Sequence, residues 1–271
     1  MIDIPAETDL VEALIPAALA AGRAILDVRA RTIDVEHKAD SSPVTEADRA
    51  AEAIILARLG EVAPDVPVVA EEAVEAGNLP GVGDVFFLVD PLDGTKEFIR
   101  GGSDFTVNIA LIRDGEPVMG IVHTPAVGTI HVGTPEGAWA GRVEGDAVVD
   151  RQPIRVRRCG GDAKVDVVAS KSHRTPETDA YIERYPVGDL VSAGSSMKFC
   201  LVAEGRADLY PRMGTTMQWD TAAGDAVLRA AGGKVVTLDG APFPYGPNGS
   251  EGVAAFRNEW FVAAGAMELK T

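Results

Sequence analysis

The chain has 271 residues, of which 46% are hydrophobic, and a formal net charge of −16 at pH 7, a composition that suits one large domain or two closely packed ones. Such an acidic chain is a poor partner for a nucleic-acid polymer, because phosphate backbones are bound by basic surfaces. Two distant cysteines, four scattered histidines, an N-terminus without signal-peptide features and no apolar run long enough to cross a bilayer favour a cytoplasmic protein without a zinc site.

The first quarter of the chain predicts two helices. Apolar residues recur near the 3.6-residue period over residues 8–30, and a second helix begins at Thr45 and ends at Gly60. The polar stretch 32–38 between them is strand-like. Thr45 and Asp48 have the spacing of a capping box with Asp in place of Glu, so the residues alone favour a capping role for Asp48.

Acidic residues then follow two short apolar runs. The β-prone run 67–70 ends at Glu71-Glu72, and the apolar run that starts at Val85 ends at Asp90. Pro91 cannot continue a strand ladder, so we expect the second strand to end there.

The turn after this second run brings two carboxylates together. Asp90 and Asp93 are three residues apart, and such carboxylates repel each other unless a proton or a hard cation such as Mg²⁺ lies between them. Gly94 and Thr95 add backbone N–H groups and a hydroxyl that can hold a phosphate oxygen or a water. Taken alone, the same segment is also typical of an ordinary surface turn.

The centre of the chain predicts an antiparallel meander after a brief helical turn at 96–100. The expected strands are 106–113, 117–123, 129–133, 137–142 and 146–151. Beyond residue 150, strands and helices alternate, which predicts an α/β half with a mixed sheet. The expected strands there are 165–169, 190–193 and 207–210, and the expected helices are 176–185, 197–204 and 219–231. We therefore expect two subdomains, 1–150 and 151–271, in one compact unit.

Four polar residues in the second half are candidates for a site, and each has an ordinary alternative. Ser195 and Lys198 form an S-x-x-K pattern, but the companion motifs of acyl-transferring serine enzymes are absent from the sequence, so Ser195 also fits a helix cap. Asp220 stands where a helix N-cap is expected, and the positive end of that helix would face a bound anion. Lys198 and Arg212 alone are typical of solvated surface cations.

Three segments together are similar to the inositol-monophosphatase superfamily of Mg²⁺-dependent, lithium-sensitive phosphomonoesterases: Glu71-Glu72, Asp90–Thr95 and Trp219–Gly224. Within it, further segments resemble the CysQ-type branch of 3′(2′),5′-bisphosphate nucleotidases. These are GTKEFI at 94–99, SKSHR at 170–174, GSSMKFC at 194–200, LVAEG at 201–205 and LYPR at 209–212. The resemblance implies a layered αβαβα sandwich with a largely antiparallel N-terminal sheet and a mixed C-terminal sheet.

Position by position, the resemblance also implies roles for single residues. Metal ligands would be the side chains of Glu71, Asp90, Asp93 and Asp220 and the carbonyl of Leu92. Asp48 and Thr95 would orient and deprotonate the attacking water, which overturns the capping preference for Asp48, and Glu71 and Asp93 would also be catalytic. Substrate contacts would come from Gly94, Thr95, His173, Ser195, Lys198, Arg212 and Asp220.

The implied activity is Mg²⁺-dependent hydrolysis of adenosine 3′,5′-bisphosphate (PAP) to AMP and phosphate, and of PAPS to APS, in sulfur metabolism. Two or more Mg²⁺ ions would be bound, Mn²⁺ would substitute, and Li⁺ and Ca²⁺ would inhibit. The alternatives are inositol 1-phosphate or fructose 1,6-bisphosphate as substrate, and a non-catalytic sensor of bisphosphate nucleotides.

Independently of the resemblance, the basic residues Lys171, Arg174, Lys198 and Arg212 suit a substrate with a second phosphate. The resemblance implies a monomer or homodimer in the cytoplasm. Some relatives associate peripherally with the inner membrane, and that is the alternative location.

Overall fold

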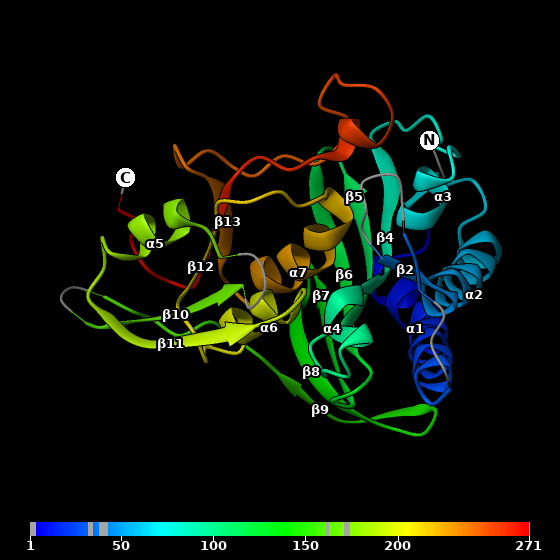
Figure 1. The fold of residues 1–271 in the computed structure, drawn as a ribbon, viewed down its shortest axis with the longest axis horizontal. Helices are drawn as coiled ribbons and strands as arrows, with labels where there is room; N and C mark the ends of the chain where they lie inside the picture. Colours follow the sequence, from blue (N-terminus) through cyan, green and yellow to red (C-terminus); the bar gives the residue numbers. More distant parts are fainter. Residues whose placement is uncertain (1–3, 32–34, 38–42, 161–162, 171–173, 271) are drawn as a thin grey trace.

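Helices and sheets alternate in layers across the molecule (Figure 1). The computed structural model describes residues 4–31, 35–37, 43–160, 163–170 and 174–270. Helices α1 (Glu7–Arg29) and α2 (Glu46–Val62) pack on the outer face of a seven-stranded sheet. Helices α6 (Met197–Ala203) and α7 (Gln218–Ala230) lie between this sheet and a five-stranded one, which α5 (Pro176–Ile182) covers from outside. The expected αβαβα sandwich is confirmed.

The seven-stranded sheet has its strands in chain order, β3-β4-β5-β6-β7-β8-β9. Its strands are β3 (Val68–Ala70), β4 (Val85–Asp93), β5 (Thr106–Arg113), β6 (Glu116–Thr124), β7 (Thr129–Thr134), β8 (Gly137–Glu144) and β9 (Ala147–Pro153). Only β3 and β4 run parallel, so the expected antiparallel meander is confirmed.

The predicted end of the second strand at Asp90 is wrong. Pairing with β5 is irregular between Asp90 and Asp93, but it resumes where Asp93 faces Thr106. Pro91 and Leu92 therefore form a bulge rather than a stop, and bulges are a common way to re-aim side chains next to a site.

The five-stranded sheet is mixed, in the order β11-β10-β12-β14-β13. Its strands are β10 (Val165–Ser170), β11 (Val187–Ala193), β12 (Leu209–Arg212), β13 (Lys234–Thr237) and β14 (Phe261–Ala264). Strand β10 pairs in parallel with β11 and β12, whereas β14 is antiparallel to its neighbours. Strand β12 lies two residues later than expected, so Arg212 is part of it.

Helix α7 packs so closely on the seven-stranded sheet that two strands carry glycine beneath it. A Cβ on Gly120 would lie 2.3 Å from the carbonyl oxygen of Ala223, and one on Gly133 would lie 2.6 Å from that of Ala226. Contacts this short do not occur between real atoms, so any side chain there would displace the helix.

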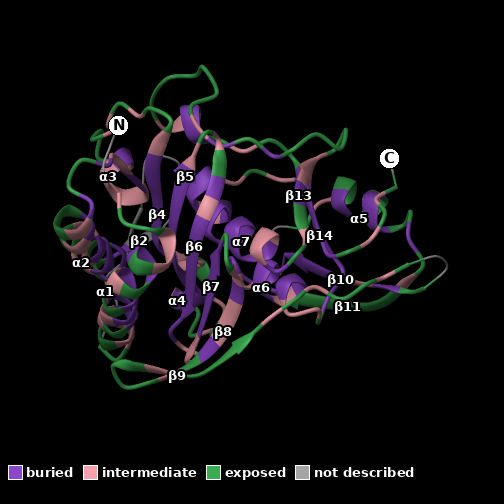
Figure 2. Cartoon of the chain, turned by 180° about the vertical axis from the view of Figure 1, so that it is seen from behind, coloured by how far each residue is buried: buried purple, intermediate pink, exposed green. Residues whose placement is uncertain are grey.

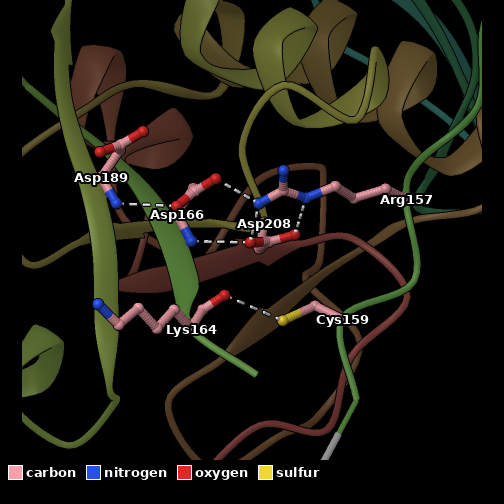
Figure 3. Close-up of polar contacts among 6 residues, drawn as sticks. All are labelled: Arg157, Cys159, Lys164, Asp166, Asp189 and Asp208. Carbon is pink, nitrogen blue, oxygen red and sulfur yellow. Dashed lines mark hydrogen bonds and ion pairs between the residues drawn. The ribbon is translucent and has the colours of Figure 1, made fainter. Parts of the chain in front are cut away.

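A buried aspartate ties the connection between the two sheets to the second sheet (Figure 3). Asp208 is 1% exposed, and its two carboxylate oxygens accept hydrogen bonds of 2.7 and 2.6 Å from the Arg157 guanidinium. It also accepts the backbone N–H of Asp166 on β10 at 2.7 Å, and Arg157 forms a second ion pair with the Asp166 carboxylate. The segment after β9 is thereby fixed to β10 and β12.

The shorter elements complete the fold. They are β1 (Val35–His37), which pairs with β2 (Pro43–Thr45), α3 (Glu71–Glu75), α4 (Thr95–Ile99) and the 3₁₀ helix η1 (Gly252–Phe256). Burial is greatest in the central strands and in α7, while β9 and β11 are largely exposed at the sheet edges (Figure 2). Within the described residues, every helix is too short or too polar to cross a membrane.

Candidate functional site

A cavity of about 530 Å³ lies where β4, α6, β12 and α7 approach one another. Its walls include most of the predicted site residues: Glu71, Asp93, Gly94, Thr95, Ser195, Lys198, Arg212 and Asp220. A larger cavity of about 880 Å³ lies beside the C-terminal segment, but its walls have none of these residues. The predicted substrate contact His173 lies outside the described residues.

The predicted metal ligands form one electrostatic group. Asp90 is 1% exposed, and its pKa is raised well above the ordinary range by burial and then by the charges of Glu71, Asp93 and Asp220. Burial and then Asp93 and Glu71 raise the pKa of Asp220 in the same way. The pKa of Asp93 is raised to about 6, chiefly by burial, against the opposing charge of Lys198. Four acids from three elements are therefore neighbours, as the family resemblance implies.

These acids fit a hard divalent cation by their chemistry. Several carboxylates buried together destabilise one another unless positive charge is supplied, and Mg²⁺ prefers oxygen ligands. Among the described residues, no three His, Cys, Asp or Glu side chains are gathered closely enough to enclose an ion in the conformations seen. The structure thus shows the donor set and its charge, and the roles of its members as ligands remain a prediction.

Asp48 performs the capping function that its spacing predicts and also reaches Thr95. One carboxylate oxygen accepts from the backbone N–H of Thr45 at 2.8 Å and from its hydroxyl at 2.7 Å, which completes a capping box at the start of α2. The other oxygen accepts from the Thr95 hydroxyl at 3.2 Å. The two interpretations of Asp48 are therefore compatible.

Thr95 is positioned by the turn at the end of β4. Its hydroxyl also lies 3.1 Å from the carbonyl oxygen of Leu92, to which it can donate instead. The preceding Gly94 has φ +96°, and a Cβ there would lie 2.8 Å from the carbonyl oxygen of Asp104. Only glycine fits this turn without strain.

The sequence predicts that Asp220 is the N-cap of α7, but in the structure it is the third residue of the helix. Met217 precedes the helix, and the Asp220 carboxylate accepts the Met217 backbone N–H at 2.8 Å. The side chain thus folds back over the first turn, beside the cavity. Its neighbour Trp219 is 2% exposed and anchors this turn in the core.

Lys198 and Arg212 are not surface cations, because they are 5% and 6% exposed. The Lys198 ammonium donates to the carbonyl oxygen of Ser195 at 2.5 Å and lies 5.2 Å from the centre of the Tyr210 ring. Burial lowers the pKa of Lys198 to about 8, although the nearby Asp93 carboxylate opposes this. Arg212 donates to the carbonyl oxygen of Thr215 at 2.9 Å. Two buried cations therefore face the cavity.

Ser195 has a strained backbone and does not cap α6. Its φ is +44°, which is uncommon for a residue with a side chain, and Ser196 occupies the N-cap position. The Ser195 hydroxyl oxygen is buried and makes no hydrogen bond to the described residues. Strain of this kind clusters at binding sites.

The structure divides the basic cluster that the sequence suggests. Lys171 lies outside the described residues, and Arg174 is exposed and paired with Asp179. Two exposed cations that sequence reasoning missed, Lys96 and Arg257, line the same cavity as Lys198 and Arg212. Arg257 follows η1, and a backbone bridge to Met217 brings it to the cavity. Such a long-range contact leaves no local signal in the sequence.

Two buried glutamates were also missed. Glu97 lines the cavity and is 9% exposed. Glu52 lies on α2 against the start of α3, with a pKa raised to about 7 by burial against the opposing backbone N–H of Glu72. A helical spacing of four residues from Asp48 is the one signal that could have indicated Glu52.

Comparisons with known proteins point to one family. Residues 7–267 match the model of the inositol monophosphatase family. The chain is 45% identical over 233 residues to the 3′(2′),5′-bisphosphate nucleotidase CysQ of Escherichia coli strain K12, covering 85% of this chain and 91% of that protein. It is 42% identical over 244 residues to the protein of the same name from Salmonella typhimurium, covering 89% and 96%.

Solved structures extend the likeness to the whole fold. The crystal structure of CysQ from Bacteroides thetaiotaomicron, a bacterial member of the inositol monophosphatase family, matches with a TM-score of 0.77 and 37% sequence identity. The match covers 96% of this chain and 98% of that one. On its sequence and its layered fold, this chain belongs to the inositol monophosphatase family.

Proposed function

We propose that the chain is a Mg²⁺-dependent phosphomonoesterase that hydrolyses adenosine 3′,5′-bisphosphate to AMP and phosphate, and PAPS to APS. The relatives named as 3′(2′),5′-bisphosphate nucleotidases support this substrate class. Turnover of PAP would place the enzyme in nucleotide recycling linked to sulfate assimilation.

One observation carries the proposal: the walls of a single cavity hold both half-buried carboxylates and buried cations. Glu71, Asp93 and Asp220 suit Mg²⁺, while Lys198 and Arg212 suit the oxygens of a phosphate. A cavity that binds only a metal or only an anion does not need both sets.

The residues of the chain fit hydrolysis by an activated water. When bound, Mg²⁺ supplies a Lewis acid for the phosphate oxygens and the attacking water. The Thr95 hydroxyl can accept a proton from that water while it donates its own to Asp48. The water oxygen then bonds to phosphorus as the bond to the ribose 3′ oxygen breaks; that oxygen takes up a proton from solvent, and Asp48 returns its proton to solvent.

The positive groups of the cavity stabilise the charge that this step develops. Lys198 and Arg212 are held in low dielectric surroundings, where their attraction for the phosphoryl oxygens is strong. The N-terminus of α7, beside Asp220, adds the positive end of a thirteen-residue helix.

Cations at two depths favour a substrate with two phosphates. Lys198 is close enough to Asp93 for the two charges to influence each other, so it lies beside the reacting phosphate. Lys96 and Arg257 are exposed at the same cavity and suit a second phosphate farther out. Inositol 1-phosphate has only one phosphate and would leave the outer cations without a ligand.

The test is phosphate release in Mg²⁺ from adenosine 3′,5′-bisphosphate, inositol 1-phosphate and fructose 1,6-bisphosphate, measured side by side. We expect a kcat/KM at least about tenfold higher for the nucleotide. A preference for inositol or sugar phosphate would contradict the nucleotide assignment and favour a broader phosphatase on the same site.

A second comparison separates an enzyme from a sensor of bisphosphate nucleotides. The Asp93→Asn variant should lose phosphate release from every substrate, with thermal unfolding of the metal-free protein close to that of the wild type. Absence of phosphate release from the wild type, together with retained nucleotide binding, would favour the sensor.

A further inference from the structure

Helix α2 carries two buried acids, one helical turn apart. Asp48 reaches Thr95, and Glu52, four residues later, faces the beginning of α3. The Glu52 side chain is 7% exposed, and one of its oxygens accepts the backbone N–H of Glu72 at 2.8 Å. The Ala73 backbone N–H also acts on this carboxylate.

Helix α3 needs such a partner at its N-terminus. The residue before it, Ala70, has no side chain that could accept a hydrogen bond, so the first N–H groups of the helix require an acceptor from elsewhere. Asp48 and Asp220 each cap the helix that contains them. Glu52 instead caps a helix other than its own.

This capped turn contains the predicted metal ligand Glu71. Parallel pairing of β3 with β4 ends where Ala70 faces Val89, so Glu71 lies one residue beyond the last paired position of the strand. The next residue, Glu72, is the one whose N–H Glu52 accepts. Glu71 therefore lies between two fixed points, the end of the strand ladder and the Glu52 carboxylate.

We propose that Glu52 is a positioning residue for the metal site, which holds the first turn of α3 so that the Glu71 carboxylate is directed toward Asp90. The two carboxyl groups of Glu71 and Asp90 are within hydrogen-bonding contact. The inference rests on the proposed metal-dependent function. Partners that orient metal ligands typically change metal affinity by about 10- to 100-fold when they are removed.

The test measures metal binding without substrate. Mn²⁺ is titrated calorimetrically into the purified, metal-free protein, and thermal unfolding of the same samples checks folding. Glu52→Ala should raise the Kd for Mn²⁺ by about tenfold or more. In activity assays it should raise the Mg²⁺ concentration for half-maximal rate by a similar factor and change kcat at saturating Mg²⁺ by less than about twofold.

Two further substitutions separate position from charge. Glu52→Gln keeps an acceptor oxygen at the same distance and should bind Mn²⁺ nearly as the wild type does. Glu52→Asp keeps the charge but shortens the side chain by one methylene, and should weaken binding severalfold. Glu61→Ala is the matched control, because Glu61 is an exposed acid on the same helix.

The outcomes are distinct. An unchanged Kd in Glu52→Ala overturns the inference, and if that variant does not fold, an unchanged Kd in Glu52→Asp overturns it instead. If Glu52→Gln weakens Mn²⁺ binding as much as Glu52→Asp or more, the inference is also overturned, because the charge of Glu52 rather than its position would then be responsible. A wild type that binds no Mn²⁺ would contradict the proposed function itself.

Discussion

At the scale of single residues, one side chain serves both the fold and the site. Asp48 closes the N-terminus of α2 with one oxygen and accepts the Thr95 hydroxyl with the other. Because capping holds the carboxylate in place, its second oxygen is directed at Thr95 without a further contact to orient it. A capping motif in a sequence is therefore no argument against a catalytic role.

Asp48→Asn tests this double role. The amide can still accept from Thr45, but it cannot take a proton, so we expect kcat to fall by about 100-fold or more with KM little changed. Steady-state kinetics on adenosine 3′,5′-bisphosphate measure the effect. Glu46→Gln, an exposed neighbour on α2, is the control; a loss of folding in Asp48→Asn, seen by circular dichroism, would mean that the cap dominates.

The buried and exposed cations of the cavity predict different substrate dependences. Lys198→Met removes charge beside Asp93, where we propose that the reacting phosphate binds, and should reduce kcat/KM by about 100-fold on both bisphosphate and monophosphate substrates. Arg257→Ala removes an exposed charge and should reduce kcat/KM by about fivefold or more, on the bisphosphate alone. Equal effects of Arg257→Ala on both substrates would contradict a second phosphate site at the outer cations.

At the scale of elements, the close packing of α7 on the sheet carries Asp220 to the other acids. Gly120→Ala forces a Cβ against the backbone of Ala223 and should lower the free energy of unfolding by about 2 kcal/mol. It should also weaken Mn²⁺ binding, because α7 must move. Urea denaturation and calorimetry measure both effects, and unchanged metal binding would show that α7 shifts without moving Asp220.

A second glycine is the control for that substitution. Gly60 lies in α2, where a Cβ meets nothing within 4 Å. Gly60→Ala should raise stability by about 0.5 kcal/mol, through helix propensity alone.

The Arg157 connection makes a different prediction, one of stability without function. Arg157→Ala leaves the buried Asp208 carboxylate without its two guanidinium hydrogen bonds and should lower the free energy of unfolding by about 2 kcal/mol. Phosphate release at 25 °C should be unchanged. The exposed neighbour Arg158 is the control, and an equal effect of Arg158→Ala would contradict the importance of the Asp208 contact.

Elements were predictable from sequence where local pattern decides them. The period of α1 and the Asp114-Gly115 turn between β5 and β6 depend on neighbours in the chain, and those elements lie where expected. Strands β13 and β14 were not predicted, because their pairing with each other and with β12 is long-range.

The site followed the same division. Asp90 and Asp93 are close in sequence, so local reasoning found them, but it could not foresee that a bulge lets the strand continue past Pro91. Burial of Lys198 and Arg212 depends on how the layers close, and a lone cation in a sequence gives no sign of that. Resemblance to a known family, not residue spacing, joined Asp220 to the other acids.

At the scale of the whole molecule, two buried histidines give stability opposite dependences on pH. His131 on β7 forms an ion pair of 2.6 Å with Glu204, beside the end of α6, so it joins two layers. Burial lowers its pKa, but Cys200 and Glu204 outweigh this and raise it to about 10. His123 on β6 has a pKa lowered to about 4, chiefly by burial.

The signs follow from which state binds the proton. His131 stabilises the fold fully below its ordinary pKa of 6.5, and this contribution is lost as pH rises toward 10, since the unfolded chain loses the proton first. His123 destabilises the fold as pH falls from 6.5 toward 4, because only the unfolded chain gains the proton there.

We therefore expect His131→Gln to flatten the alkaline side of the stability profile alone. Urea denaturation of the wild type should show a decrease of roughly 2 kcal/mol between pH 7 and pH 9, and the variant should lose most of this decrease. His123→Gln should act only on the acid side. A His131→Gln profile parallel to that of the wild type would contradict the raised pKa.

The place of α7 between the sheets also constrains how the chain is made. The seven-stranded sheet ends at Pro153, but the helix that covers its inner face runs from Gln218 to Ala230. During synthesis, apolar residues on that face, such as Ile112 and Val122, remain uncovered until residues 154–217 and then α7 itself have been made. A stalled or truncated product would expose this surface, associate with others like it and lack Asp220. Only a chain synthesised past α7 can therefore be active. Until α7 is made, a chaperone that binds the exposed face of the sheet would protect the chain from association.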